Sequence, residues 1–359
     1  MNDFWARRVW ERRDPLASLL WILLLPLSFL YGLGAWLRNL LYSLGWLRAR
    51  SLPRPVISVG NLTVGGTGKT PTTLWLAHEL GKWGYRVAIL SRGYRRKDKE
   101  PVILGPSDSA RNGDEAFAAG DEPVMMARVF GQRVGVGAKR YEVASRLLRE
   151  AEVDVFLLDD GFQHRQLKRD LDLLLLGSDR DGWLLPAGPF REPKGSLRRA
   201  HFYLITDSRE KWEHFLASRE KRSIFFGSLQ PSKLLSLEGN RWKEYPLSLL
   251  DRSKIVTVCA IARPALFYRM IHEWEGEIVD TLEFRDHHVY STKDWQRINR
   301  AGRSADFIVT TEKDILKLTR FPFAREKLLA LRVEMVVEDG PALIRAVEKV
   351  IQEKLRNID

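Results

Sequence analysis

Two patterns of apolar and polar positions, one typical of strands and one typical of helices, alternate along most of the chain. Short apolar runs of strand length recur, and several of them are followed by stretches in which apolar residues have helical spacing. Strands that alternate with helices predict an α/β fold with a doubly wound, mostly parallel sheet. The expected strands of the first half are residues 56–59, 86–90, 134–136, 153–158, 171–176 and 202–206, and the expected helices are residues 72–83 and 138–150.

The pattern changes near Gly227. Two short runs on either side of Glu238-Gly239-Asn240 predict a hairpin over residues 234–245. A second alternating unit follows, with expected strands at 254–261, 278–284, 306–310 and 328–337 and expected helices at 265–274, 292–303 and 341–356. We therefore expect four parts: an N-terminal helical segment, a larger α/β domain, a two-stranded linker and a smaller, Rossmann-like α/β domain, over residues 1–50, 51–226, 227–250 and 251–359.

The N-terminal segment carries no charge from Pro15 to Leu37, which is long enough to cross a bilayer. Pro26 lies in the middle, where it would kink a helix. Arginines stand on both sides of the run, so the positive-inside rule favours both ends at the cytoplasmic face. We expect a kinked, amphipathic helical hairpin or re-entrant segment docked on a membrane, with a buried core helix as the alternative. One small or polar stripe recurs at helical spacing: Ser28, Gly32, Ala35, Asn39 and Ser43.

A Gly-rich turn follows the first expected strand and precedes Lys69-Thr70 and a helical pattern. This order of strand, glycine loop, Lys-Thr and helix is that of a phosphate-binding P-loop. Lys69 would reach the β- and γ-phosphates of ATP, and the Thr70 hydroxyl would hold Mg²⁺. The standard pattern has Gly where Thr63 stands, and the ParA/MinD variant has Lys where Val64 stands. The expected ATP-binding residues are Thr63, Val64, Gly65, Gly66, Thr67, Gly68, Lys69 and Thr70.

Two aspartates, Asp159 and Asp160, directly follow the apolar strand at 153–158. Ligands of open α/β sheets bind at the carboxyl ends of strands, where the P-loop also begins. We therefore expect the two motifs to face one site and the carboxylates to bind Mg²⁺, directly or through water.

The net charge of +12 suits an anionic partner, such as a nucleotide, a phospholipid surface or nucleic acid. The basic residues are spread along the chain and no nucleic-acid recognition module is visible, so we expect no nucleic-acid partner. No protein partner is evident. Cys259 is the only cysteine, which excludes an intrachain disulfide and fits a reducing compartment.

Taken together, these motifs resemble one family, the tetraacyldisaccharide 4′-kinases of lipid A biosynthesis. The resemblance covers most of the chain, in the family's order: Gly60 to Pro71, Ser91 to Tyr94, Gly120 to Pro123, Asp159 to His164, Leu185 to Pro189 with Arg191-Glu192, Asp286-His287 and Thr311 to Asp314. The chain departs from the family where Ala260 takes the place of an expected glycine.

The resemblance implies a P-loop kinase domain at 51–226. It also implies a reaction in which the γ-phosphate of ATP is transferred to the 4′-hydroxyl of a membrane-borne tetraacyldisaccharide 1-phosphate, and the product is lipid IV-A. It places the protein at the cytoplasmic face of the bacterial inner membrane, with an anionic membrane surface as a partner. It assigns Asp121 as the base and His287 as the residue that orients it, and it adds Glu192 to the Mg²⁺ cluster of Asp159 and Asp160. It also relates three residues to phosphates or substrate: Arg92, Tyr94 and Arg191.

Two other classes share part of this pattern. A membrane-associated ATPase switch of the ParA/MinD type would account for the P-loop and the apolar N-terminus, but Val64 replaces its signature lysine. A GTPase would need one residue between the lysine and aspartate of its guanine-reading motif, whereas Lys313 and Asp314 are adjacent.

Overall fold

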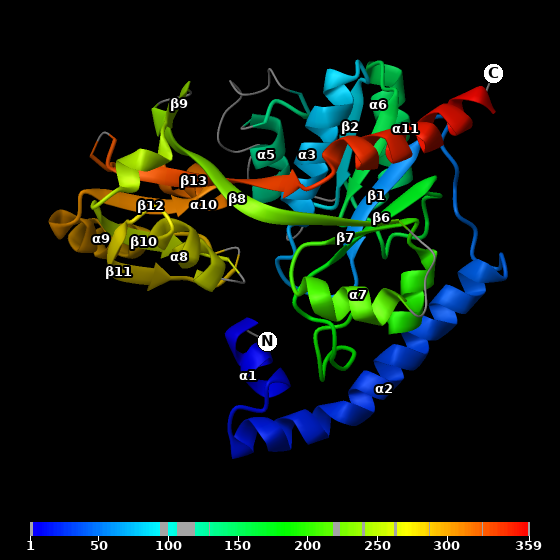
Figure 1. Cartoon of the computed structure of the whole chain (residues 1–359), viewed down its shortest axis with the longest axis horizontal. Coiled ribbons are helices and arrows are strands. Elements are labelled where there is room, and N and C mark those ends of the chain that lie inside the picture. Colours follow the sequence, from blue (N-terminus) through cyan, green and yellow to red (C-terminus); the bar gives the residue numbers. More distant parts are fainter. Residues whose placement is uncertain are drawn as a thin grey trace.

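The computed structural model describes residues 3–93, 100–105, 119–128, 130–217, 223–238, 241–261, 264–286, 288–324 and 326–357. Within these residues, thirteen strands form one sheet: twelve follow one path in the order β11-β10-β12-β13-β8-β7-β6-β1-β5-β2-β4-β3, and β9 lies off this path, paired to β8. The path divides into a larger and a smaller α/β unit that meet at β8 (Figure 1). The expected α/β class is confirmed.

The larger unit is a mostly parallel sheet with β1 near its centre. Every residue of β1 is buried, as expected for a strand covered on both faces. The strands pair in parallel, except that β3 is antiparallel to β4. The strands and helices of this unit are β1 (Val56–Asn61), α3 (Lys69–Lys82), β2 (Val87–Ser91), β3 (Val102–Leu104), α5 (Asp121–Arg128), β4 (Arg133–Val136), α6 (Arg140–Glu150), β5 (Val155–Asp159), β6 (Leu171–Leu176), β7 (Phe202–Ile205) and α7 (Arg209–Ala217).

The smaller unit repeats the same construction. Strands β11, β10, β12 and β13 pair in parallel, and β13 pairs antiparallel with β8. Helix α10 begins at an N-cap, where the Thr311 side chain accepts a hydrogen bond from the backbone N–H of Asp314. The elements are β10 (Lys254–Cys259), α8 (Pro264–His272), β11 (Glu277–Glu283), α9 (Thr292–Ala301), β12 (Phe307–Thr311), α10 (Glu312–Leu318), β13 (Leu328–Val337) and α11 (Gly340–Arg356).

The two units share a strand. β8 (Ser223–Glu238) pairs in parallel with β7 near its start, and later along its length it pairs antiparallel with β13. It also pairs antiparallel with β9 (Arg241–Tyr245), which confirms the expected hairpin. The expected two-stranded linker over 227–250 is therefore built into the sheet, because β8 also pairs with β7 and β13.

The last helix corrects the expected second domain of residues 251–359. Leu343, Ile344, Val347 and Ile351 of α11 pack in the same core as β1 and α3 of the larger unit. The reason is the direction of β13, which leads the chain back across the boundary between the units before α11 begins (Figure 1).

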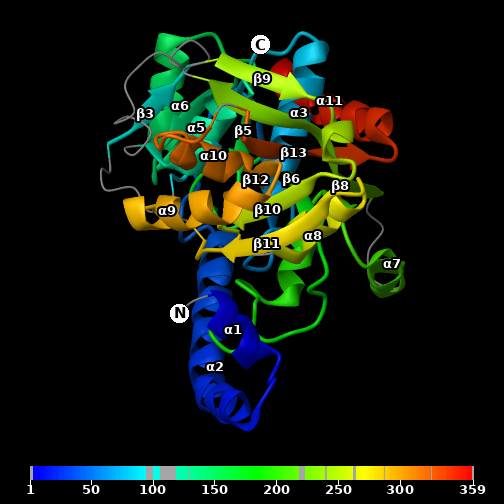
Figure 2. The ribbon, with the colours of Figure 1, turned by 90° about the vertical axis from the view of Figure 1, so that its left-hand side faces the viewer.

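The N-terminus forms two helices, α1 (Asp3–Trp10) and α2 (Pro15–Ser43). The expected hairpin or re-entrant fold of 15–37 is wrong, because α2 is one helix of 29 residues that contains Pro26 and curves along the larger unit (Figure 1). Surrounding turns keep such a helix continuous despite the lost backbone hydrogen bond. By length and composition α2 could cross a membrane. In Figure 2, α1 and much of α2 project beyond the sheets of the two units.

Candidate active site

The P-loop lies between β1 and α3 at the carboxyl edge of the larger sheet. Gly68 has φ +84° at the N-cap of α3, in a left-handed conformation that favours glycine. Asn61 donates a side-chain hydrogen bond of 2.8 Å to Thr67, and the backbone N–H of Val64 donates one to the Pro189 carbonyl. The loop is thus fixed from both sides, with the N-terminus of α3 available to an anion.

Lys69 opens α3 and turns back over the loop. Its ammonium donates to the Gly65 carbonyl at 3.3 Å and lies 3.7 Å from a carboxylate oxygen of Asp160. Burial lowers the pKa of Lys69, and the nearby Asp160 opposes that shift. The structure therefore places the Lys69 ammonium against the glycine-rich loop and beside Asp160.

Asp159 ends β5, the neighbour of β1, and its side chain points at α3. The Thr70 hydroxyl donates to it at 3.3 Å and the Thr73 hydroxyl at 3.1 Å. Burial, followed by the charges of Glu122 and Asp160, raises the pKa of Asp159 to about 7. A carboxylate and a hydroxyl side by side among crowded negative charges are hard oxygen donors that fit Mg²⁺.

Asp160 has a left-handed backbone, with φ +52°. Arg191 donates to both of its carboxylate oxygens, at 2.9 and 2.8 Å. Burial alone would raise the pKa of Asp160, but Lys69 and Arg191 outweigh burial and hold the pKa at about 2. The two adjacent aspartates thus have opposite environments: Asp159 lies mainly among negative charges, whereas Asp160 lies beside two cations.

Asp121 begins α5 on the larger unit, where the helix dipole favours acidic residues. A carboxylate oxygen of Asp121 lies 3.2 Å from the ammonium of Lys317, which belongs to α10 of the smaller unit. Its neighbour Glu122 lies 3.5 Å from Lys313 of the same helix. The amino end of α5 therefore lies at the junction of the two units.

Glu192 is not part of the acidic cluster expected for Mg²⁺. Its fully buried carboxylate accepts hydrogen bonds from Arg38 and Asn39 of α2 and from Arg199. Among the described residues, no group of three His, Cys, Asp or Glu side chains could hold a metal ion. The reason is the path of α2, which brings Arg38 and Asn39 within hydrogen-bond distance of the Glu192 carboxylate.

Arg92 is exposed just past β2, and Tyr94 and His287 lie outside the described residues. Sequence reasoning missed three residues near the aspartates: Thr73, Glu122 and Arg140. Arg140 begins α6 and is buried, and burial followed by the charge of Arg92 lowers the pKa of Arg140 to about 10. Of these three residues, only Glu122 could have been found from the sequence, because it stands within the motif at 120–123.

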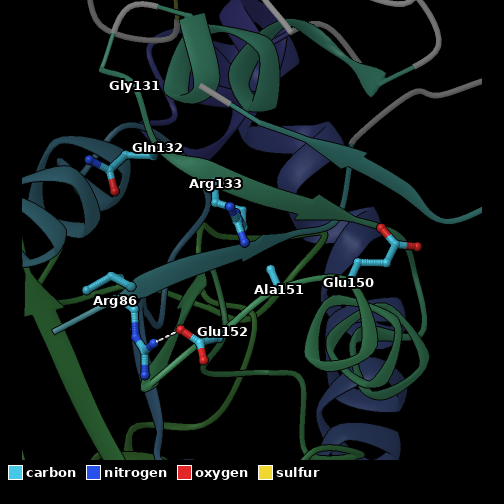
Figure 3. A pocket seen from close by; sticks show the side chains of 8 residues that line it. Arg86, Gly131, Gln132, Arg133, Glu150, Ala151 and Glu152 are labelled. Atoms are coloured by element: carbon cyan, nitrogen blue, oxygen red, sulfur yellow. Dashed lines mark hydrogen bonds and ion pairs between the residues drawn. The ribbon is translucent and has the colours of Figure 1, made fainter. Parts of the chain in front are cut away.

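A cavity of about 560 Å³ lies elsewhere, lined by Arg86, Arg133, Glu150 and Glu152 among others (Figure 3). Arg86 and Arg133 stand at the amino-terminal starts of β2 and β4, so this cavity lies at the edge of the sheet opposite the P-loop. Arg86 forms ion pairs with Glu152 and Asp154 there. Ligands of open α/β sheets bind at the other edge, so we assign the chemistry to the P-loop edge.

The P-loop edge combines a backbone anion cradle, a buried lysine, hard oxygen donors and a carboxylate from a helix start. Phosphoryl transfer needs this set, because it depends on charge neutralisation and positioning rather than on covalent chemistry. The family model described as tetraacyldisaccharide-1-P 4′-kinase matches residues 20–352. The chain belongs to the tetraacyldisaccharide 4′-kinase family.

Curated members of the tetraacyldisaccharide 4′-kinase family align over nearly the whole chain. The kinase of Syntrophus aciditrophicus is 39% identical, and the alignment covers 93% of this chain and 94% of that relative. The kinase of Shewanella halifaxensis is 33% identical, covering 98% and 99%. A crystal structure of LpxK from Aquifex aeolicus in complex with ATP has a TM-score of 0.76 at 32% identity, and it covers 92% of this chain and 99% of that chain.

Membership of the tetraacyldisaccharide 4′-kinase family makes the chain an ATP-dependent kinase. The resemblance inferred from the motifs is confirmed. Membership favours the kinase over the ATPase switch and the GTPase, whose sequence patterns fitted only in part.

Proposed function

We propose that the protein transfers the γ-phosphate of ATP to the 4′-hydroxyl of a tetraacyldisaccharide 1-phosphate, the step that forms lipid IV-A. The observation that carries the proposal is the meeting of Lys69, Thr70 and the Asp159–Asp160 pair at the carboxyl edge of one sheet. The printed names of the relatives supply the acceptor, and the site supplies the phosphoryl-transfer chemistry.

The P-loop backbone and Lys69 would cradle the phosphates of ATP, and the Thr70 hydroxyl and Asp159 would hold Mg²⁺. Bound Mg²⁺ neutralises phosphate charge. Asp160 stands beside Lys69 and Arg191 and would keep both cations close to the transferred group. Arg92 and Tyr94 remain candidates for the phosphates or the sugar head group.

Asp121 would accept the proton of the sugar hydroxyl, because a hydroxyl acceptor needs a base within hydrogen-bond reach. The family resemblance gives His287 the role of orienting that base. Asp121 belongs to the larger unit, and His287 directly follows Asp286 of the smaller unit in the sequence, so residues of both units would complete the site.

The acceptor carries acyl chains and stays in a bilayer, so the enzyme must work at a membrane surface. We infer that it docks at the cytoplasmic face of the inner membrane, and two features of α2 support docking on a membrane. Its outer face exposes large apolar side chains, among them Leu23, Phe29 and Leu30. Its inner face is tied to the loop beside the P-loop, through hydrogen bonds from Trp21 to the Ala187 carbonyl and from Ser28 to the Leu184 carbonyl.

The test is transfer of radiolabel from γ-labelled ATP to a tetraacyldisaccharide 1-phosphate in detergent micelles. We expect labelled bis-phosphorylated product from the wild-type protein, and slow transfer by Asp121→Ala and His287→Ala. The control is Asp207→Asn, which changes an exposed aspartate. ATP hydrolysis that is independent of the acceptor, with no labelled lipid, would overturn the kinase and favour the ATPase switch.

A further inference from the structure

Helix α10 of the smaller unit presents two lysines toward α5 of the larger unit, where the views of Figures 1 and 2 place the helices near each other. Lys313 and Lys317 stand four residues apart, so both lie on one face of α10. Their side chains are only 11% and 8% exposed, which is unusual for lysine. Burial on this scale requires partners for both ammonium groups.

The ammonium of Lys317 has three oxygens around it. It lies 3.2 Å from Asp121 and 2.9 Å from Asp314, and it donates to the His288 carbonyl at 3.1 Å. An ammonium has three N–H groups, so three oxygens at these distances fix its position. Asp314 is itself fully buried, and it accepts hydrogen bonds from the backbone N–H of Ala260 and the Thr311 hydroxyl. Lys317 thus presents a fixed charge to Asp121.

Lys313 makes a parallel pair of contacts. Its ammonium lies 2.9 Å from Asp286 and 3.5 Å from Glu122. Burial would lower the pKa of Lys313, but Glu122 and Asp286 outweigh burial and raise it. Each lysine therefore links the first turn of α5 to the chain around residues 286 and 288.

We propose that Lys317 and Lys313 are positioning residues for the phosphoryl transfer, and that Lys317 acts through Asp121. Lys317 holds the Asp121 carboxylate in one orientation. Lys313 holds Glu122 and Asp286, so the first turn of α5 and the loop of the smaller unit keep one relative position. The inference rests on the proposed function, because it takes Asp121 as the base. Neither lysine needs to contact the nucleotide.

The test compares Lys317→Met and Lys317→Arg with an exposed control, Lys293→Met on α9, in the same lipid-phosphorylation assay. For Lys317→Met we expect kcat to fall roughly 10- to 100-fold, a fraction of the 10²–10⁴ that acid–base catalysis supplies, with KM for ATP nearly unchanged. Lys317→Arg keeps the charge and should recover most of kcat. Lys313→Met should give a smaller loss of the same kind.

A second comparison separates positioning from a merely structural role. In an Asp121→Asn background, adding Lys317→Met should reduce the residual kcat no further, because the group it acts on is already neutral. Two results would overturn the inference: wild-type kcat in Lys317→Met, or an equal loss in both backgrounds together with a lower melting temperature and weaker ATP binding. If the wild-type protein labels no lipid, the proposed function fails instead, so the two failures are distinguishable.

Discussion

The hydroxyl of Thr70 lies 3.3 Å from the nearer carboxylate oxygen of Asp159, which joins the first turn of α3 to the end of β5. Both groups are oxygen donors of the kind that Mg²⁺ takes, and Asp159 is buried. The relationship is the basis of the first prediction.

Asp159→Asn removes the charge at this position and keeps the shape. We expect kcat to fall roughly 100-fold or more, on the scale of losing one preorganised electrostatic group, and the Mg²⁺ concentration for half-maximal activity to rise. Mg²⁺ titrations of the lipid-phosphorylation rate measure both effects. Asp207→Asn is the matched control, because Asp207 also follows a parallel strand of this sheet but is exposed. An unchanged Mg²⁺ midpoint in Asp159→Asn would refute the assignment.

The outer face of α2 should bind lipid. Phe29 is 72% exposed and Leu23 is 63% exposed, and burying one such side chain in a bilayer contributes about 1.5–3 kcal/mol. We therefore expect Phe29→Glu and Leu23→Glu to weaken cosedimentation with anionic vesicles roughly 10-fold or more each, with ATP binding unaffected. The control is Val279→Glu, which removes an exposed apolar side chain from β11 of the smaller unit. Equal losses in the control and in the α2 variants would argue against a membrane face on α2.

Gly60 has no room for a side chain. A Cβ added there would lie 2.6 Å from the Cβ of Phe162 and 2.8 Å from its backbone nitrogen. Gly60→Ala should lower the free energy of unfolding by about 1–3 kcal/mol, because the buried strand β1 cannot move away. Gly81→Ala is the opposite case, since its added Cβ would meet nothing within 4 Å inside helix α3, and it should stabilise by about 0.5–1 kcal/mol. Urea denaturation of the two variants measures whether the free energy of unfolding falls in the first and rises in the second.

His164 should make stability depend on pH. Burial, followed by the charges of Arg140 and Arg169, lowers the pKa of His164 from 6.5 to about 3. Between these values the unfolded chain binds a proton that the folded chain does not, so stability is lost as pH falls through this window. The contribution of one group approaches about 1.4 kcal/mol per pH unit. The slope of unfolding free energy against pH should therefore be flatter in His164→Gln than in the wild type, and unchanged in the exposed control His78→Gln. A slope in His164→Gln equal to that of the wild type would contradict the assignment.

The sequence predicted the residues that local rules govern. Glycines before Lys69 predict a phosphate-binding loop, and aspartates after an apolar strand predict a ligand site. Both motifs follow strands of a parallel sheet, so they lie at the same edge of that sheet. The sequence also showed the small stripe on α2, but not its partner: Ser28 and Gly32 are buried against the larger unit. Gly32 contacts Leu184 closely enough that an added Cβ would lie 2.6 Å from it.

Other residues depend on contacts between distant segments. Nothing local to Glu192 reveals that Arg38 and Asn39 will occupy its carboxylate. Lys313 and Lys317 resemble the solvated lysines of any amphipathic helix until α5 is packed against them. The amphipathic pattern of α11 predicts a buried face but does not specify which core receives it.

The packing of α11 against the larger unit affects how the protein folds during translation. The core around the P-loop is started by β1, yet it is closed by Ile344, Val347 and Ile351, close to the end of the chain. While the ribosome is still translating the smaller unit, the larger unit lacks its last layer and leaves the apolar surface of α3 uncovered. The larger unit therefore completes its core only after α11 has been synthesised, and a truncation that removes α11 should damage the nucleotide site rather than the smaller unit that precedes it in the chain.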